Sequence, residues 1–193
     1  MGAKGLKTRE VIQEKAYELF AQKGFSSVTM KDICEATGLS RGGLYRHYNS
    51  TQEIFEEIFA HLSGSDIDFI KEKIESRIPA AELLEQVLGR MEQEMMDQER
   101  SLSYAIYEYS CTCGNDFMVR LNGEAKEKWR QILQYGISTG EFREVDIGQM
   151  TDLILYAYQG IRMWSRVIPM EEQTVHNIAE KIRKDLVKDD ERI

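Results

Sequence analysis

Apolar residues recur at three- and four-residue spacing along most of the chain, a period that favours α-helices over β-strands. From Lys7 to Lys23 the apolar positions fall on one side of a helix, and Gly24 follows as a residue typical of helix ends. The pattern therefore predicts a first amphipathic helix over residues 7–23.

Capping residues divide the next part of the chain into short elements. Thr29 stands three residues before Asp32, which predicts the start of a second helix that ends at Gly38. Ser40 predicts the start of a third, short helix through Tyr48, and the box Ser50-Thr51-Gln52-Glu53 predicts a fourth that continues to Leu62. Two short helices joined by a tight turn with glycine form a helix-turn-helix, whose second helix enters a DNA major groove.

The rest of the chain follows without a linker rich in Pro, Gly or Ser. Its periodicity predicts further helices near residues 66–77, 80–97, 101–112, 117–138, 147–167 and 171–188. We therefore expect an all-α fold with an N-terminal three-helix helix-turn-helix domain over residues 1–50. A C-terminal helical domain for effector binding and dimerisation is expected over residues 51–193.

Charge separates these two parts. The 193 residues carry a net charge of −8, yet residues 1–50 hold eight Lys or Arg against five Asp or Glu. A small basic module that meets phosphates, joined to an acidic body, explains this asymmetry. No stretch approaches the roughly 20 apolar residues of a membrane span, and the N-terminus does not resemble a secretory signal. We expect a cytoplasmic protein.

The third helix has an unusual composition for a purely structural element. Gly42 and Gly43 fall in its first turn, where each costs about 1 kcal/mol relative to Ala. Close approach to a phosphate or to the groove floor would compensate, and donors surround the two glycines at Arg41, Tyr45, Arg46 and His47. The alternative is that Leu44 and Tyr48 are core residues and the others are simply solvated.

The run from Gly24 to Tyr48 resembles the DNA-binding signature of the tetracycline-repressor (TetR) family. It has the Gly-Phe pair, a Thr that opens the next helix, an Ala-x-Gly-Leu-Ser turn, and then Gly, Leu-Tyr and His-Tyr. The likeness implies a homodimer with a helical ligand-binding body. It also implies DNA contacts at Thr29, Arg41, Gly42, Tyr45 and His47. With the composition of the third helix, the predicted DNA-binding residues are Thr29, Lys31, Ser40, Arg41, Gly42, Gly43, Tyr45, Arg46 and His47.

Three positions depart from that family pattern. Gly43 stands where Thr is common, Thr51 where Lys is common, and Cys34 where Ala is common. The first two departures remove possible DNA contacts, so base specificity is expected to depend more on Arg41 and Arg46.

The last two helices are the expected dimer interface. The helix near 147–167 carries two apolar stripes, and one buried face cannot cover both. Paired with their symmetry mates, these helices would form a four-helix interface. The alternative is that both stripes are buried within one chain. The predicted interface residues are Ile154, Ala157, Ile161, Trp164, Val175, Ile178 and Ile182.

Methionine and aromatic side chains are concentrated in the middle of the body. Such a cluster forms either ordinary core or the lining of an effector pocket, with a few polar groups that fix orientation. The candidate pocket residues are Met91, Met95, Tyr104, Tyr107, Glu108, Phe117 and Trp129.

Motifs for enzyme chemistry are lacking in the sequence. There is no nucleotide-binding Gly loop and no nucleophile elbow. Cys111 and Cys113 are spaced Cys-x-Cys without nearby third and fourth ligands, which argues against a zinc site. No catalytic residue, cofactor or metal is expected.

The function expected from the sequence is that of a DNA-binding repressor. It would bind a near-palindromic operator and be released by a small, largely apolar or aromatic effector. The alternative is an activator, or a regulator controlled by a protein partner or by thiol oxidation.

Overall fold

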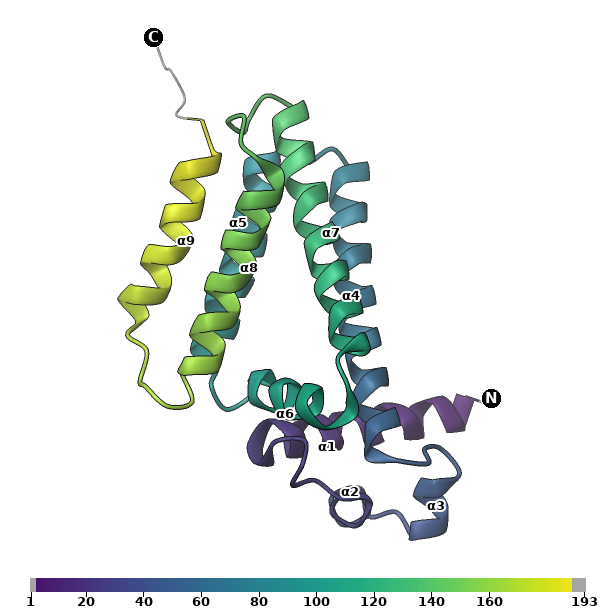
Figure 1. Ribbon diagram of the computed structural model, residues 1–193. Helices are drawn as coiled ribbons and strands as arrows, with labels where there is room; N and C mark the ends of the chain where they lie inside the picture. Colours follow the sequence, from purple (N-terminus) through teal and green to yellow (C-terminus); the bar gives the residue numbers. More distant parts are fainter. Residues whose placement is uncertain (1–2, 189–193) are drawn as a thin grey trace. The chain divides into compact units, whose positions relative to one another are not determined.

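The computed structural model describes residues 3–188 of the chain (Figure 1). Within this range the fold is all-helical, as expected, with one isolated β-bridge between Phe142 and Val187. No helix in residues 3–188 is both long and apolar enough to cross a bilayer. The helices are α1 (Ala3–Lys23), α2 (Met30–Thr37), α3 (Arg41–Tyr45), α4 (Thr51–Glu75), α5 (Ala80–Met96), α6 (Ser103–Cys113), α7 (Asp116–Ser138), α8 (Ile147–Trp164) and α9 (Glu172–Leu186).

The short N-terminal helices begin where the sequence predicts them. The Thr29 hydroxyl accepts a hydrogen bond from the Asp32 backbone N–H, and the Asp32 carboxylate accepts one from the Thr29 N–H. Ser40 caps α3 by accepting from the N–H of Gly43 at 3.1 Å. Gly38 ends α2 in a left-handed conformation with φ of 69°. These elements are specified by neighbouring residues, so local patterns suffice to locate them.

Helix α4 corrects the sequence prediction of two separate helices, one through Leu62 and one over residues 66–77. It is one element from Thr51 to Glu75, and Gly64 lies inside it. A single glycine inside a helix costs only about 1 kcal/mol, which the remainder of a long helix offsets.

The described chain forms two compact units that do not follow chain order. The first unit reaches Ser63 and also includes Glu99–Met118, and the second comprises Gly64–Gln98 with the chain from Val119 onward. This differs from the expected division at residue 50. The difference arises because α6 packs with α1, a long-range contact that sequence periodicity does not reveal.

Aromatic rings form the core of the first unit. The Phe55 ring of α4 is 5.0 Å, between centroids, from each of the rings of Phe20, Phe25 and Tyr109. These rings come from α1, the turn after α1, and α6. Edge-to-face and stacked pairs at this separation add to the gain from burying apolar area. The cluster thus binds three distant segments together.

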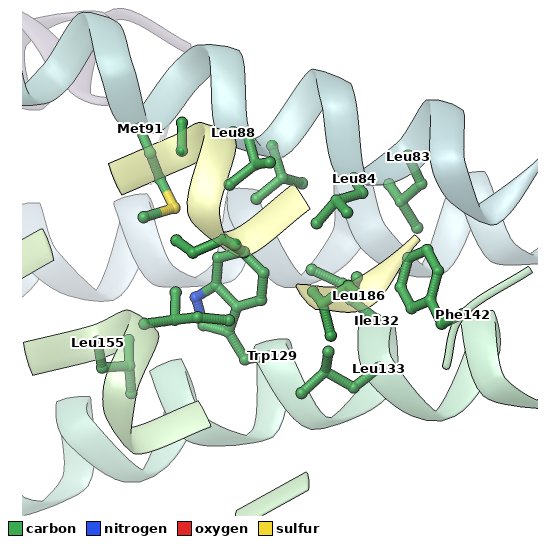
Figure 2. Packing of buried hydrophobic residues seen from close by; sticks show 14 of the residues in the cluster. Leu83, Leu84, Leu88, Met91, Trp129, Ile132, Leu133, Phe142, Leu155 and Leu186 are labelled. Atoms are coloured by element: carbon green, nitrogen blue, oxygen red, sulfur yellow. The ribbon is translucent and has the colours of Figure 1, made fainter. Parts of the chain in front are cut away.

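The core of the second unit lies among α5, α7, α8 and α9. Figure 2 shows Leu84, Leu88 and Met91 on α5 facing Trp129 and Ile132 on α7.

The close approach of an aromatic ring to a helix backbone also shapes this core. A Cβ atom added at Gly136 of α7 would lie 2.1 Å from the Phe142 ring, which is itself buried. Glycine is therefore required where Phe142 folds back onto α7.

A carboxylate distant in sequence caps α5. The two Glu141 oxygens accept hydrogen bonds from the backbone N–H groups of Ala80 and Ala81, at 2.9 and 3.0 Å. Burial alone would raise the pKa of Glu141, but the hydrogen bonds from Ala81 and Ala80, with one from Thr139, outweigh it and hold that pKa below its ordinary value. The charged form of Glu141 is thus favoured in the folded protein.

Glu141→Gln should reduce the stability of the folded protein by about 1 kcal/mol at neutral pH, because the amide carries one acceptor oxygen and no charge. The depressed folded pKa means that this contribution is complete above the unfolded pKa of about 4.3 and is lost as pH falls through the lower folded value. Urea-unfolding midpoints of both proteins, measured from neutral pH to about pH 3.5, should therefore converge as the solution is acidified.

Glu144→Gln, at an exposed position of the same connection, is the control and should leave the midpoint unchanged. A wild-type advantage that persists unchanged into acid would contradict the capping role of the charged carboxylate.

Candidate nucleic-acid interface

Helix α3 is attached to the first unit by one side. Leu44 is fully buried and Tyr48, just beyond the helix, is 1% exposed. Arg41, Tyr45 and Arg46 are exposed. The arrangement fits a recognition helix, which needs a fixed inner side and a polar outer side.

A polar network from α1 and α4 holds the end of this recognition element. The Arg9 guanidinium lies 4.2 Å from the centroid of the Tyr48 ring and donates to the His47 carbonyl at 3.2 Å. It also forms an ion pair with Glu57. Gln13 donates to the Tyr48 hydroxyl at 2.8 Å and to Glu57 at 2.7 Å. Arg9 and Glu57 were not predicted from the sequence, because they lie 48 positions apart and belong to no local motif.

The nine residues proposed for DNA binding differ in accessibility. Gly43 and His47 are half-buried, and the His47 Nδ1 atom is enclosed without a hydrogen-bond partner among the described residues. Exposed on α2, α3 and the flanking turns are Thr29, Lys31, Ser40, Arg41, Gly42, Tyr45 and Arg46. The structure thus brings most of the predicted set to the surface of one helix-turn-helix.

Thr29 is already engaged within the chain. Both its N–H and its hydroxyl donate to the Asp32 carboxylate, which also pairs with Lys23 at 2.9 Å. The hydroxyl of Thr29, followed by the ammonium of Lys23, lowers the pKa of Asp32 far below its ordinary value, so this carboxylate is charged. A phosphate at Thr29 would have to displace or tolerate that charge.

The cations of α3 are available for an external partner. Among residues 3–188, neither Arg41 nor Arg46 has a carboxylate within ion-pair distance. The Arg41 guanidinium carbon lies 5.5 Å from the centroid of the Tyr45 ring, so the ring restrains this cation without neutralising it. Lys31 is paired only loosely with Glu35, at 3.7 Å with both side chains exposed.

Helix α6 is an unexpected part of the same unit. Glu108 accepts a hydrogen bond from the Ser26 N–H at 3.2 Å, in the turn between α1 and α2. Tyr17 of α1 donates to the carbonyl of Arg100 at 2.8 Å. Glu108 thus supports the helix-turn-helix, and its role in an effector pocket stays a prediction.

The structure corrects part of the predicted dimer interface. Ile154, Val175 and Ile182 are at most 1% exposed and belong to the core of the second unit, so they have no surface to offer a partner. Periodicity shows that a helix has an apolar face but not which protein buries it. Of the other four, Trp164 is exposed and three are half-buried: Ala157, Ile161 and Ile178.

Helix α8 has an exposed apolar face that differs from the interface residues predicted from the sequence. Leu153, Tyr156 and Trp164 are 53%, 61% and 57% exposed, and their spacing puts them on one side of the helix. Val167 and Ile168 continue the exposed apolar surface beyond its end. Adjacent large apolar residues in contact with solvent are typical of an interaction surface.

The candidate effector residues are divided between the two units. Met91, Met95 and Trp129 are buried core residues of the second unit. Tyr104 and Tyr107 are exposed on α6 of the first unit. Phe117 also belongs to that unit, where its ring lies 5.2 Å from the Tyr109 ring. That these residues line one effector pocket therefore stays a prediction.

The second unit has a cleft whose wall is formed mostly by polar residues. A cavity of about 470 Å³ lies between α7 and the start of α8, with Lys126, Arg130, Thr151 and Asp152 in its wall. None of the seven predicted effector residues lines it.

The cysteines are spread over two helices of the first unit. Cys34 is half-buried on α2, whereas Cys111 and Cys113 are exposed at the end of α6. In the described part of the chain, no three His, Cys, Asp or Glu side chains are grouped as a metal site would require.

Comparison with known proteins places this geometry in a family. Residues 12–58 match the model of the bacterial regulatory proteins, tetR family. The HTH-type transcriptional regulator YfiR of Bacillus subtilis is 27% identical over 92% of this chain and 89% of its own length. The HTH-type transcriptional repressor KstR2 of Rhodococcus jostii is 29% identical over 72% of this chain and 70% of its own.

Solved structures share the fold over nearly the full length. A TetR-family transcriptional regulator from Agrobacterium tumefaciens superposes with a TM-score of 0.78 at 13% identity, covering 95% of this chain and all of that one. The matched residues 12–58 contain α2 and α3, together with Gln13 and Glu57 of the network that holds them. The chain is therefore a helix-turn-helix transcriptional regulator of the tetR family.

Proposed function

We propose that this chain represses transcription as a homodimer that binds a near-palindromic operator and leaves it when a small, largely apolar or aromatic effector binds. The DNA-binding part of this proposal depends on the surroundings of Gly42. Its φ is not positive, and a Cβ added there would meet no atom within 4 Å. The chain's own fold does not require glycine at this exposed helical position, whereas close approach of a DNA backbone does.

The nine residues from Thr29 to His47 form the proposed DNA-binding surface. Arg41 and Arg46 are its main cations, since both are exposed on α3 and uncompensated within the described chain. Arginine forms paired hydrogen bonds with guanine edges and also binds phosphates. Lys31 and Tyr45 extend the surface on either side.

The exposed α8 face supports the proposed dimer. A second copy of the chain presents the same apolar strip, so the two faces can cover each other about a two-fold axis. Burying Leu153, Tyr156 and Trp164 against a partner would remove large apolar side chains from water. A two-fold dimer also explains why a palindromic operator is expected.

Effector control is proposed through α4, which belongs to both units. A ligand can lower operator affinity only by binding better to a conformation that fits DNA less well. By reciprocity, operator must weaken ligand binding to the same extent.

A cytoplasmic location is part of this proposal. An activator, or a regulator answering to a protein partner or to oxidation of Cys111 and Cys113, is the alternative.

The purified chain should select, from a random duplex library, sites with two-fold symmetric halves about one helical turn, or a multiple of it, apart. Arg41→Ala should abolish this selection.

Tyr156→Glu combined with Trp164→Glu should give monomers by light scattering and should weaken binding to the full site much more than to a half-site. Val119→Glu, on α7 and also exposed, is the matched control. A stable dimer that survives both substitutions would place the interface elsewhere.

Gly42→Ala should raise the melting temperature and lower operator affinity at the same time. The helix gains up to about 1 kcal/mol from alanine, whereas the added methyl group meets the DNA backbone. Fluorescence anisotropy should record a loss of about tenfold or more, equivalent to about 1.4 kcal/mol. Gly89→Ala on α5, where a Cβ also meets nothing within 4 Å, should stabilise without affecting DNA binding. Unchanged affinity in Gly42→Ala would show that DNA does not approach this position.

Arg9→Met should weaken operator binding without changing its salt dependence, because Arg9 positions α3 and touches no phosphate in this proposal. Arg46→Met, which removes a proposed phosphate contact, should reduce the slope of log K against log salt concentration by about 1. The slopes are measured by titrating operator at several salt concentrations. If Arg9→Met reduces the slope as much as Arg46→Met does, Arg9 itself contacts the DNA.

A further inference from the structure

A charged network lies between α5 and α8 in the second unit. The Tyr158 hydroxyl donates to the Glu94 carboxylate, and the Arg162 Nη1 atom donates to the Tyr158 hydroxyl at 2.5 Å. The Arg162 guanidinium carbon also lies 5.0 Å from the centroid of the Tyr158 ring. Between Arg162 and Glu94 the ion pair is long, at 3.8 Å.

The cation in this network has too few partners for its burial. The Arg162 side chain is 17% exposed, whereas that of Glu94 is 54% exposed. The Arg162 Nε atom is buried and has no hydrogen-bond partner among the described residues. Burial of a guanidinium is unfavourable unless the cation is paired and its donors are satisfied. Here the network satisfies it only in part.

An anion is the group that would complete the network. Glu94 retains much of its hydration, so it can turn toward solvent at low cost, whereas Arg162 cannot. A carboxylate has two oxygens, which match the fork of Nε and Nη donors on arginine. Burial raises the pKa of Tyr158 above its ordinary value, so its hydroxyl keeps its proton and can donate to the same anion.

The surroundings indicate the rest of the ligand. Tyr158 packs against the apolar core that includes Met91 and Met95 of α5 and Leu155 of α8. Figure 2 shows Met91, with its flexible thioether, within this cluster. Methionine side chains adapt readily to an apolar guest.

We propose that Arg162 and Tyr158 bind the carboxylate of an otherwise apolar effector, an inference that rests on the proposed control by a small ligand. The ligand class is therefore a monocarboxylic acid with an extended apolar chain or ring. Its carboxylate displaces that of Glu94 from the tyrosine hydroxyl and accepts from Nε of the arginine.

Three probes of equal chain length test the head group: decanoate, decan-1-ol and decylamine, each titrated calorimetrically into the full-length protein. Decanoate should bind at least tenfold more tightly than the alcohol, and the amine should bind most weakly. Arg162→Gln should remove the preference for the acid over the alcohol. Arg162→Lys keeps the charge but loses the paired donors of the guanidinium, so it should retain part of the preference for the acid. Tyr158→Phe should reduce that preference.

Arg183→Gln is the matched control. Arg183 also joins a helix to α5, since its guanidinium pairs with Glu85, and its Nη2 donates to that carboxylate at 2.6 Å. If Arg162 merely ties two helices together, both glutamine variants will lower the melting temperature and neither will change the preference for the acid. That result would overturn the proposal.

Failure of this proposal is distinguishable from failure of the proposed function, because operator binding is measured on the same samples without ligand. Three results would contradict the carboxylate site while operator binding is retained. None of the probes binds, or the alcohol or the amine binds as tightly as the acid, or Arg162→Gln keeps the preference for the acid. If the unmodified protein does not bind an operator, that result would instead contradict the proposed repressor function.

Discussion

The contact between Phe55 and Tyr109 is the constraint on which the geometry of the first unit depends. Phe55 lies near the start of α4 and Tyr109 lies on α6, and their stacked rings join segments that are 54 residues apart in the chain. Phe20 and Phe25 pack against the same ring from α1 and its following turn. An isolated helix-turn-helix of this size would bury little apolar surface. The aromatic cluster supplies that burial and so fixes the helices that carry the recognition residues.

Charge and packing are then divided between the two sides of one short helix. Leu44 is the buried residue of α3, and Tyr48, just beyond the end of the helix, is in contact with Arg9 and Gln13. The outer side keeps its arginines free of ion pairs with the described residues. A five-residue helix has almost no stability of its own. Its orientation is therefore a property of α1 and α4, and a change in either reaches the residues proposed to read DNA.

Sequence reasoning succeeded where a structural feature is encoded by neighbours and failed where it depends on distant partners. Thr29, Gly38 and Ser40 mark helix ends through hydrogen bonds and dihedral angles within a few residues, so their pattern located the helix-turn-helix. The apolar positions of α8 run around most of the helix, and only the packed structure shows that Ile154 is core while Tyr156 is surface. The hydrogen bond of Glu108 was not predicted for the same reason, since its partner Ser26 lies 82 residues away.

The attachment of α6 to the turn at Gly24 has a consequence for recombining such regulators. Gly24 has a φ of 81°, and a side chain there would meet the Glu108 carboxylate and the Tyr104 ring. The surface of α6 is thus shaped to the loop that it supports. A chimera that transplants only the N-terminal fifty residues onto a foreign body would lose this fitted support, together with half of the aromatic cluster. The exchangeable module of this architecture is therefore discontinuous: it consists of the N-terminal helices and the segment Glu99–Met118, taken as a pair.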